Sequence, residues 1–240
     1  MKGIILAGGS GSRLAPLTKV TSKQLLPIYN KPMIYYPLNT LLEAGINEIL
    51  FIVAPEHAGD YVNFLGSGRE FNARFSFEVQ DKPLGLAHGL SLAENFVNGE
   101  TCCMILGDNI FLGHDFKKDV SGFTSGAKIY VKEVPDPERF GVAEFDAEGH
   151  VISIEEKPKN PKTNFAQVGM YMYDEPVFDL IKTMKPSDRG ELEITDLNNI
   201  YLNKGVLTAE IMTGNWIDAG TFESLHKAAI LIRERELNEK

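Results

Sequence analysis

Short apolar runs alternate with segments of helical period through the first half of the chain, and this alternation constrains the fold most. Residues 3–7 and 48–54 are short, almost wholly apolar runs typical of strands buried on both faces. Residues 32–44 lie between them with apolar side chains at helical spacing, and Gly45 follows as a helix stop. Such β-α-β units predict an α/β, doubly wound, Rossmann-like fold whose central sheet is mixed but mostly parallel.

The second half of the chain changes character and predicts antiparallel strands. Residues 146–149 have turn chemistry between two apolar runs, 141–145 and 150–155, which we expect to form a hairpin. We expect a single domain over 1–240, made of two merged halves at about 1–110 and 111–240. The other expected strands are 74–80, 101–106, 127–132, 168–173, 206–212 and 215–217, and the other expected helices are 56–65, 86–96, 176–184, 192–204 and 222–236.

A glycine-rich loop, GGSGSR at residues 8–13, directly follows the first expected strand. Glycines there let backbone N–H groups approach a phosphate without a side chain in the way. The pattern G-x-x-x-x-G-K-[ST] is absent, and G-x-G-x-x-G started at Gly9 meets Leu14 at its last glycine. Arg13 and Lys23 alone would be ordinary exposed side chains. Beside a glycine cradle they indicate a site for nucleoside triphosphate phosphates.

The composition restricts the partners. The chain has 24 Lys+Arg against 33 Asp+Glu, a net charge of −9, so its mean field repels nucleic acid. An anionic ligand must therefore be held by a few placed cations and backbone amides.

Cys102 and Cys103 are adjacent in an apolar run and are expected to be reduced core thiols. No apolar run approaches the ~20 residues that span a bilayer, and no signal peptide is recognisable, so we expect a cytoplasmic protein without a membrane partner.

The loop together with KQLLP at residues 23–27 resembles the signature of sugar-1-phosphate nucleotidyltransferases. The resemblance is closest to the branch that uses dTTP and glucose 1-phosphate. It implies that residues 1–110 bind the nucleotide and that residues 111–240, with the C-terminal helix, bind the sugar. It extends in the family's order through KPMIYYP (31–37), VQDKPLGLA (79–87), LGDNIF (106–111), ERFGV (138–142), EEKP (155–158), GELEITD (190–196) and WIDAGT (216–221).

This resemblance also implies which residues bind the nucleotide. Gln80, Pro83 and Gly85 match the stretch that faces the base, and Gln24 matches a position facing the base or deoxyribose. The other implied nucleotide ligands are Leu6, Gly8, Gly9, Ser10, Gly11, Arg13 and Asp108.

Asp108 follows an apolar strand at its carboxyl end, where open α/β sheets bind ligands. A lone Asp in such a place is commonly a turn or cap residue, so a metal site needs a second oxygen ligand from elsewhere. Asp218, after the short strand that contains Trp216, supplies it. By resemblance these two aspartates hold Mg²⁺ against the nucleotide phosphates, which suits the preference of magnesium for one or two carboxylates plus substrate oxygens.

Glu156 and Lys157 are the expected sugar-phosphate site, because a carboxylate can accept from hydroxyls while the ammonium meets the phosphate. Strand alternation would separate their side chains, so we expect a backbone bend before Pro158. Asn109 and Gly141 complete the pocket by resemblance. The strand AQVG at 166–169 departs from the A-V-T-G of the thymidylyltransferases, so Gln167 is assigned to the sugar site and the identity of the sugar is open.

The implied reaction is in-line attack of the sugar phosphate on the α-phosphorus of dTTP, giving dTDP-glucose and pyrophosphate on the route to dTDP-deoxysugars such as dTDP-rhamnose. The nucleophile is already anionic, so catalysis requires positioning and electrostatics rather than a general base. A UTP- or CTP-using enzyme and a catalytically silent nucleotide-binding relative are the alternatives. The expected catalytic residues are Arg13, Lys23, Asp108, Lys157 and Asp218.

Four further expectations concern the histidines, residues 190–196, regulation and assembly. The five histidines have no ligand spacing and receive no role, and residues 190–196 are expected to start a helix and order the site rather than react. Longer relatives carry additional C-terminal helices that build a regulatory nucleotide site, which we expect to be missing or altered here. The resemblance also implies a homodimer or homotetramer.

Overall fold

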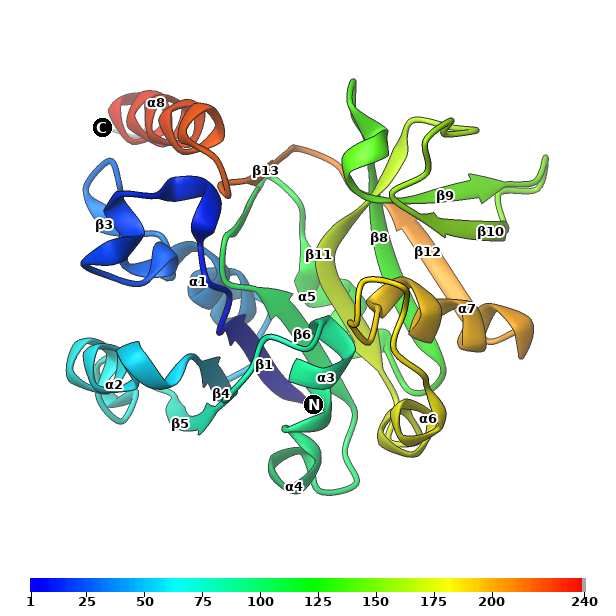
Figure 1. Ribbon diagram of the computed structural model, residues 1–240, viewed down its shortest axis with the longest axis horizontal. Helices are drawn as coiled ribbons and strands as arrows, with labels where there is room; N and C mark the ends of the chain where they lie inside the picture. The colour runs from blue at the N-terminus through cyan, green and yellow to red at the C-terminus, as the bar shows by residue number, and fades with distance from the viewer. Residues whose placement is uncertain (239–240) are drawn as a thin grey trace.

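The computed structural model describes residues 1–238, and one nine-stranded sheet crosses it (Figure 1). Four parallel strands form its first part: β1 (Lys2–Ala7), β4 (Glu48–Val53), β5 (Arg74–Val79) and β6 (Cys102–Leu106). β1 lies between β4 and β6, so its carboxyl end and the loop that follows are central in the sheet. This is the position where open α/β sheets bind ligands.

The second part of the sheet is mixed and is organised around one long strand, β11 (Phe165–Tyr173). β11 runs antiparallel to β6 and also pairs with β8 (Ala127–Glu133) and β9 (Gly141–Phe145). β9 and β10 (Val151–Glu156) form the expected antiparallel hairpin, and β12 (Leu207–Ile211) adds to β8 in parallel. The predicted α/β fold with a large mixed sheet is therefore confirmed.

Helices cover both faces of the sheet, because both faces of its central strands are apolar. Ile4 of β1 lies in one buried cluster and Ile5 in the other, and Cys102 and Cys103 divide in the same way as free thiols. The first cluster is covered by α3 (Leu86–Ser91), α4 (Glu94–Val97), α6 (Val177–Thr183) and α7 (Ile194–Asn203), and the second by α1 (Tyr35–Glu43), α2 (Ala58–Leu65) and α5 (Phe116–Gly122).

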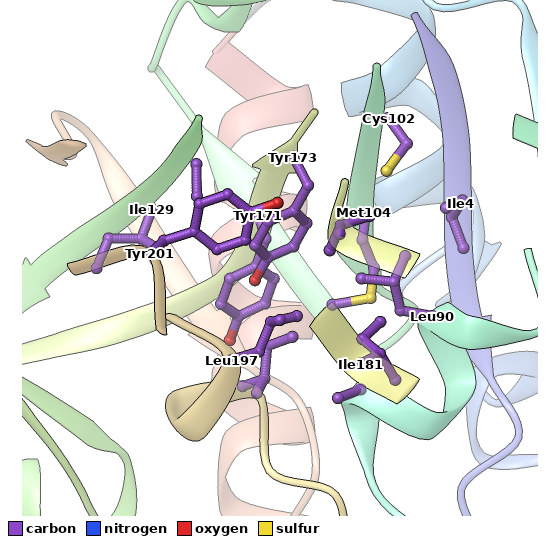
Figure 2. Packing of buried hydrophobic residues seen from close by; sticks show 14 of the residues in the cluster. Ile4, Leu90, Cys102, Met104, Ile129, Tyr171, Tyr173, Ile181, Leu197 and Tyr201 are labelled. Atoms are coloured by element: carbon purple, nitrogen blue, oxygen red, sulfur yellow. The ribbon is translucent and has the colours of Figure 1, made fainter. Parts of the chain in front are cut away.

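Three tyrosines fill the first cluster where α7 meets β11 (Figure 2). The rings of Tyr171 and Tyr173 stack with centroids 6.4 Å apart, and that of Tyr201 lies 5.7 Å from Tyr173. A buried phenol needs a hydrogen-bond partner. The Tyr173 hydroxyl donates to Asn198 Oδ1 (2.6 Å) and the Tyr201 hydroxyl to Asp174 Oδ1 (2.8 Å). These bonds fix α7 on the sheet.

Two small ribbons and the last helix lie beside the main sheet. β7 (Asn109–Leu112) pairs with β13 (Asn215–Asp218), and β2 (Pro27–Ile28) pairs with β3 (Lys31–Pro32). α8 (Phe222–Asn238) packs on both ribbons through a third apolar cluster and lies next to β3 in Figure 1. No helix among residues 1–238 is long and apolar enough to cross a membrane.

Several predicted boundaries were wrong. The expected helix 86–96 is two short helices, α3 and α4, separated at Leu92–Ala93. The helix expected from residue 32 begins at Tyr35, because Pro32 belongs to β3. The helix expected from residue 56 begins as a 3₁₀ turn at Pro55–His57 before α2. β7 and α5 were not predicted, because they are only four and seven residues long, respectively.

Burial on both faces gives a stability prediction. Ile4→Ala and Ile5→Ala should each lower the free energy of unfolding by about 2–5 kcal/mol, because each removes methyl groups from a fully buried position. The control Ile152→Ala, at a residue that is 52% exposed in β10, should change it by less than about 0.5 kcal/mol. Urea titration followed by circular dichroism measures all three. If one of the two core substitutions lowered the unfolding free energy as expected and the other hardly changed it, burial on both faces would be contradicted.

Candidate active site

Asp108 and Asp218 meet at one end of the β7–β13 ribbon, although 110 positions separate them in the sequence. Asp108 directly precedes β7, and Asp218 is the last residue of β13, opposite Asn109. The backbone N–H of Ala219 donates to the carbonyl of Asp108 (2.9 Å). Only 12% of the Asp108 side chain and 16% of the Asp218 side chain are exposed. The ribbon therefore holds two largely buried carboxylates next to each other.

The two carboxylates have opposite pKa shifts. Burial alone would raise the pKa of Asp108, but the Lys23 ammonium, 2.5 Å from Oδ2, and the Asn109 amide outweigh it and lower that pKa. Burial and the neighbouring charge of Asp108 raise the pKa of Asp218 to about 6. Negative charge at Asp218 is therefore only partly compensated within the protein.

Two arginines flank Asp218. Nη2 of Arg13 and Nη2 of Arg139 each lie 4.0 Å from Asp218 Oδ2. Arg13 stands in a 3₁₀ turn directly after the glycine loop, and a Cβ added to Gly220 would lie 2.6 Å from Arg13 Nη2. Sequence reasoning missed Arg139, although it belongs to the ERFGV motif. The structure thus brings Arg13, Lys23 and both predicted metal ligands together.

The glycine loop leaves the carboxyl end of β1 and is open to solvent. Gly9 and Ser10 are exposed at its tip, and Leu6 lies below it at the end of β1, 9% exposed. Gly11 has φ +62°, and a Cβ there would lie 2.8 Å from Thr18. Glycine is needed at this position for both its conformation and its size.

Gln80 adjoins this loop from the end of β5. A Cβ added to Gly8 would lie 2.9 Å from Gln80 Oε1, so only glycine allows this approach. The Gln80 amide nitrogen lies 2.9 Å from His88 Nδ1, a residue to which sequence reasoning gave no role. The next stretch carries exposed Pro83 and then Gly85, whose φ is +103°. Of the predicted base-facing residues, Gln80 therefore lies against the loop, whereas Gly85 lies against Leu192.

Gln24 has an internal role that the sequence did not predict. It is 2% exposed, and its Oε1 accepts from Ser22 Oγ (2.9 Å) and from the Tyr61 hydroxyl (3.2 Å). This oxygen is therefore committed to holding the segment that carries Lys23 against α2.

The predicted sugar-side residues gather at the ends of β9, β10 and β11. Lys157 has φ +46°, which confirms the expected bend, and its Nζ lies 3.5 Å from Glu156 Oε1. The Thr195 hydroxyl donates to Glu156 Oε2 (2.6 Å), and Gln167 Nε2 donates to Thr195 Oγ1 (3.1 Å). A Cβ added to Gly141 would collide with Gln167 Nε2. Thr195 thus orients Glu156 directly, and Gln167 orients Thr195.

Asn109 has internal hydrogen bonds that the sequence did not predict. Its Oδ1 accepts from the Gly169 backbone N–H (3.0 Å) and from Trp216 Nε1 (2.6 Å), and its Nδ2 donates to Asp108 Oδ1 (3.0 Å). It is 2% exposed. Asn109 therefore ties the ribbon to β11 and orients Asp108, and the second N–H of its amide is the group left for the predicted sugar contact.

The segment before α7 connects the two sides of the site. The Leu192 backbone N–H donates to the Leu84 carbonyl (2.8 Å), and the Ala87 N–H donates to the Leu192 carbonyl (3.1 Å). Glu193 accepts from Arg189 on both carboxylate oxygens. The predicted ordering network in residues 190–196 is confirmed. It links the stretch predicted to face the base to the residues predicted to bind the sugar phosphate.

A cavity of about 770 Å³ opens beside Asp218, between residues 132–140 and α8. Arg139 and Trp216 line it together with the amino-terminal half of α8. Its volume suits a small organic ligand. Asp218 is part of its wall, whereas Asp108, Gln80 and the glycine loop are not.

Comparison with known proteins is consistent across nearly the whole chain. The family model described as "Nucleotidyl transferase" matches residues 2–235. The glucose-1-phosphate thymidylyltransferase of Neisseria meningitidis is 49% identical over 238 residues, covering 97% of this chain and 83% of the relative. That of Mycolicibacterium smegmatis is 46% identical and covers 100% and 84%.

Solved structures agree. A putative glucose-1-phosphate thymidylyltransferase from Bacillus anthracis, in complex with a sucrose, superposes with a TM-score of 0.92 at 53% identity, covering 97% of this chain and 95% of that chain. A UDP-glucose pyrophosphorylase complexed with UDP-glucose superposes with a TM-score of 0.87 at 25% identity, covering 98% of each. The resemblance carried by the motifs is thus confirmed, and this chain belongs to the nucleotidyl transferase family.

Proposed function

We propose that this chain is a Mg²⁺-dependent glucose-1-phosphate thymidylyltransferase. It would transfer the thymidylyl group of dTTP to α-D-glucose 1-phosphate and release pyrophosphate. The observation that carries the proposal is the convergence of two buried carboxylates with Arg13 and Lys23 next to a glycine loop at the carboxyl end of β1. The relatives from Neisseria meningitidis, Mycolicibacterium smegmatis and Bacillus anthracis, which match nearly the whole chain, are named as glucose-1-phosphate thymidylyltransferases.

The residues present fit a magnesium ion. Asp108 and Asp218 offer oxygen ligands only, and the raised pKa of Asp218 shows that the protein's own cations do not fully compensate its charge. A hard divalent cation held by two carboxylates and by substrate oxygens meets this need. When bound, it would neutralise phosphate charge and stabilise the departing pyrophosphate.

The remaining groups would hold the two anionic substrates in line. Arg13 and the amides of the glycine loop would bind the triphosphate, and Lys23 would exchange Asp108 for a phosphate oxygen when the nucleotide enters. Lys157, on its bend, would meet the sugar phosphate, and Glu156 would accept from sugar hydroxyls. The attacking phosphate oxygen is anionic at neutral pH, so the site needs no general base.

A preference for thymine or uracil over cytosine is supported by Gln80. Its amide nitrogen is held by His88, which turns the amide oxygen toward Gly8. An acceptor fixed at this place suits the N3–H of thymine or uracil and opposes cytosine, whose N3 is itself an acceptor. UTP use is the second candidate, because the UDP-glucose pyrophosphorylase shares the fold.

We further propose that residues 1–240 act as one unit, with the nucleotide in the first half and the sugar in the second. The hydrogen bonds of Leu192 across the two halves support this proposal. We also propose a cytoplasmic homo-oligomer whose product enters dTDP-deoxysugar synthesis.

Pyrophosphate release with Mg²⁺, glucose 1-phosphate and each of dTTP, UTP, CTP, ATP and GTP tests the function. We expect dTTP to be used fastest and CTP to be poor. A preference for UTP would establish the second candidate. No release with any nucleotide, together with tight dTTP binding, would establish a silent binding protein instead.

Removal of one catalytic charge should abolish most of the activity without unfolding the protein. Arg13→Ala and Asp108→Asn should each lower turnover about a hundredfold or more, since the first removes a cation that would bind the phosphates and the second removes a carboxylate that would hold the metal against them. Lys19→Ala and Asp188→Asn remove the same charges from exposed positions and should react normally. Near-normal turnover in Arg13→Ala or Asp108→Asn would overturn the assignment.

Asp218 should destabilise the metal-free protein above its own pKa. Its pKa is about 6 in the folded protein against 3.8 ordinarily, so it favours folding below pH 4 and loses that contribution as the pH rises through 6. In EDTA at pH 8, Asp218→Asn should therefore exceed the wild type in unfolding free energy, by on the order of 2 kcal/mol.

The difference should disappear at pH 4, and the control Asp188→Asn should show none at either pH. Chemical denaturation at both pH values measures it. A less stable Asp218→Asn protein at pH 8 would mean that the charge of Asp218 is well compensated and that the site has no need of an added cation.

A further inference from the structure

A second cluster of metal-ligating side chains lies at the other end of the β7–β13 ribbon. His114 follows β7, Asp119 lies in α5 and Glu210 lies in β12, so three separate elements contribute. One ligand atom from each lies within 4.8 Å of the others. The β7–β13 ribbon separates this cluster from Asp108 and Asp218.

His114 carries an unpartnered nitrogen into this cluster. Its side chain is only 5% exposed, and its Nε2 is buried without a hydrogen-bond partner among residues 1–238. Nε2 lies 3.6 Å from Asp119 Oδ2 and 3.9 Å from Glu210 Oε1. These distances are too long for hydrogen bonds.

The other ring nitrogen can serve either tautomer of His114. The Thr213 backbone N–H donates to Nδ1 (3.2 Å), and in that tautomer the N–H of Nε2 faces Asp119 Oδ2 and Glu210 Oε1. Nδ1 also lies 3.0 Å from Thr213 Oγ1, and that hydroxyl lies 3.3 Å from the Gly113 carbonyl, so Nδ1–H can instead donate to Thr213 and Thr213 to Gly113. In this second tautomer Nε2 offers a lone pair, so a metal ion would take the place of the Nε2 proton.

The surrounding charges leave room for a cation. Lys128 Nζ bonds Asp119 Oδ1 and Glu210 Oε2, at 2.6 Å each, and therefore occupies one oxygen of each carboxylate. The Tyr130 hydroxyl donates to the other oxygen of Asp119, Oδ2 (2.9 Å). Two carboxylates against one ammonium leave one uncompensated negative charge, and the oxygens free of Lys128 face Nε2.

We propose that His114, Asp119 and Glu210 bind one transition-metal ion of the Zn²⁺ type. One imidazole and two carboxylates are a borderline donor set, suited to zinc, cobalt or manganese rather than to magnesium. With zinc bonds of about 2.0–2.2 Å, tetrahedral ligand atoms lie about 3.3–3.5 Å apart. The two pairs that involve Nε2, at 3.6 and 3.9 Å, need to close by only a few tenths of an ångström, and the two carboxylate oxygens lie within 4.8 Å of each other. The Nδ1–H to Thr213 bond is the outer contact that a zinc-bound histidine commonly makes.

Such an ion would stabilise the position of the β7–β13 ribbon, which carries Asp108 and Asp218 at its other end. His114 and Thr213 stand where β7 ends and β13 begins, while Asp119 and Glu210 belong to the framework of α5 and the main sheet. Binding at the site would therefore fix the base of the ribbon and stabilise the folded chain by mass action.

Zinc and cobalt titrations of the full chain, treated with chelator and then held in excess Mg²⁺ to occupy the oxygen-only site, test the proposal. The wild type should bind one zinc per chain by equilibrium dialysis, show a visible cobalt absorption band, and gain thermal stability with zinc. His114→Ala and Glu210→Gln should weaken zinc binding at least tenfold and lose the stability gain.

His150→Ala is the matched control, because His150 lies 3.3 Å from a single carboxylate, Asp146, and this variant should bind zinc like the wild type. Zinc binding that persists in both His114→Ala and Glu210→Gln would overturn the proposal. So would a wild type that binds no zinc. Should His114→Ala fail to fold, Glu210→Gln and the wild-type cobalt band decide the matter.

Discussion

The arrangement of the site depends on a short antiparallel ribbon that brings two carboxylates together against their mutual repulsion. Asp108 and Asp218 come from segments that are far apart in the chain, and the hydrogen bond from Ala219 to the Asp108 carbonyl closes the ribbon between them. Asn109 ties the same ribbon to β11 and orients Asp108. The backbone and the Asn109 amide hold the two aspartates in place, so burial and then the charge of Asp108 raise the pKa of Asp218.

The groups around this pair are arranged so that substrates and a metal can complete the charge balance. Lys23 neutralises Asp108 directly, whereas Arg13 and Arg139 stay 4.0 Å from Asp218 and keep donors available. Arg13 is more than half exposed. A site of this kind is ready to accept anions and a cation together, which is the requirement of phosphoryl transfer between two negatively charged substrates.

Much of this organisation could be predicted from the sequence, because it follows from local patterns. Buried apolar runs predicted the parallel strands, turn residues predicted the β9–β10 hairpin, and the residue pair before Pro158 predicted the bend at Lys157. The loop motif and the two aspartates predicted the charged centre, which the structure brings together.

The features that escaped prediction depend on contacts between distant segments. β7 has only four residues and exists because β13 pairs with it. His88 has no local signal, since its role arises from its neighbour Gln80. Arg139 belongs to the ERFGV motif, but only its distance to Asp218 shows its role. Gln24 and Asn109 were assigned to ligands by resemblance, but their buried hydrogen bonds within the chain could not be read from the motif.

The proposed function requires that Asp108 and Asp218 together hold one divalent cation against the nucleotide. The most direct measurement is a crystal structure with dTTP and Mn²⁺, in which anomalous scattering locates the metal. The account predicts one manganese that contacts both carboxylates and the phosphates, with Lys23 moved from Asp108 to a phosphate. Manganese on the phosphates alone, with Asp218 still beside Arg13 and Arg139, would contradict it.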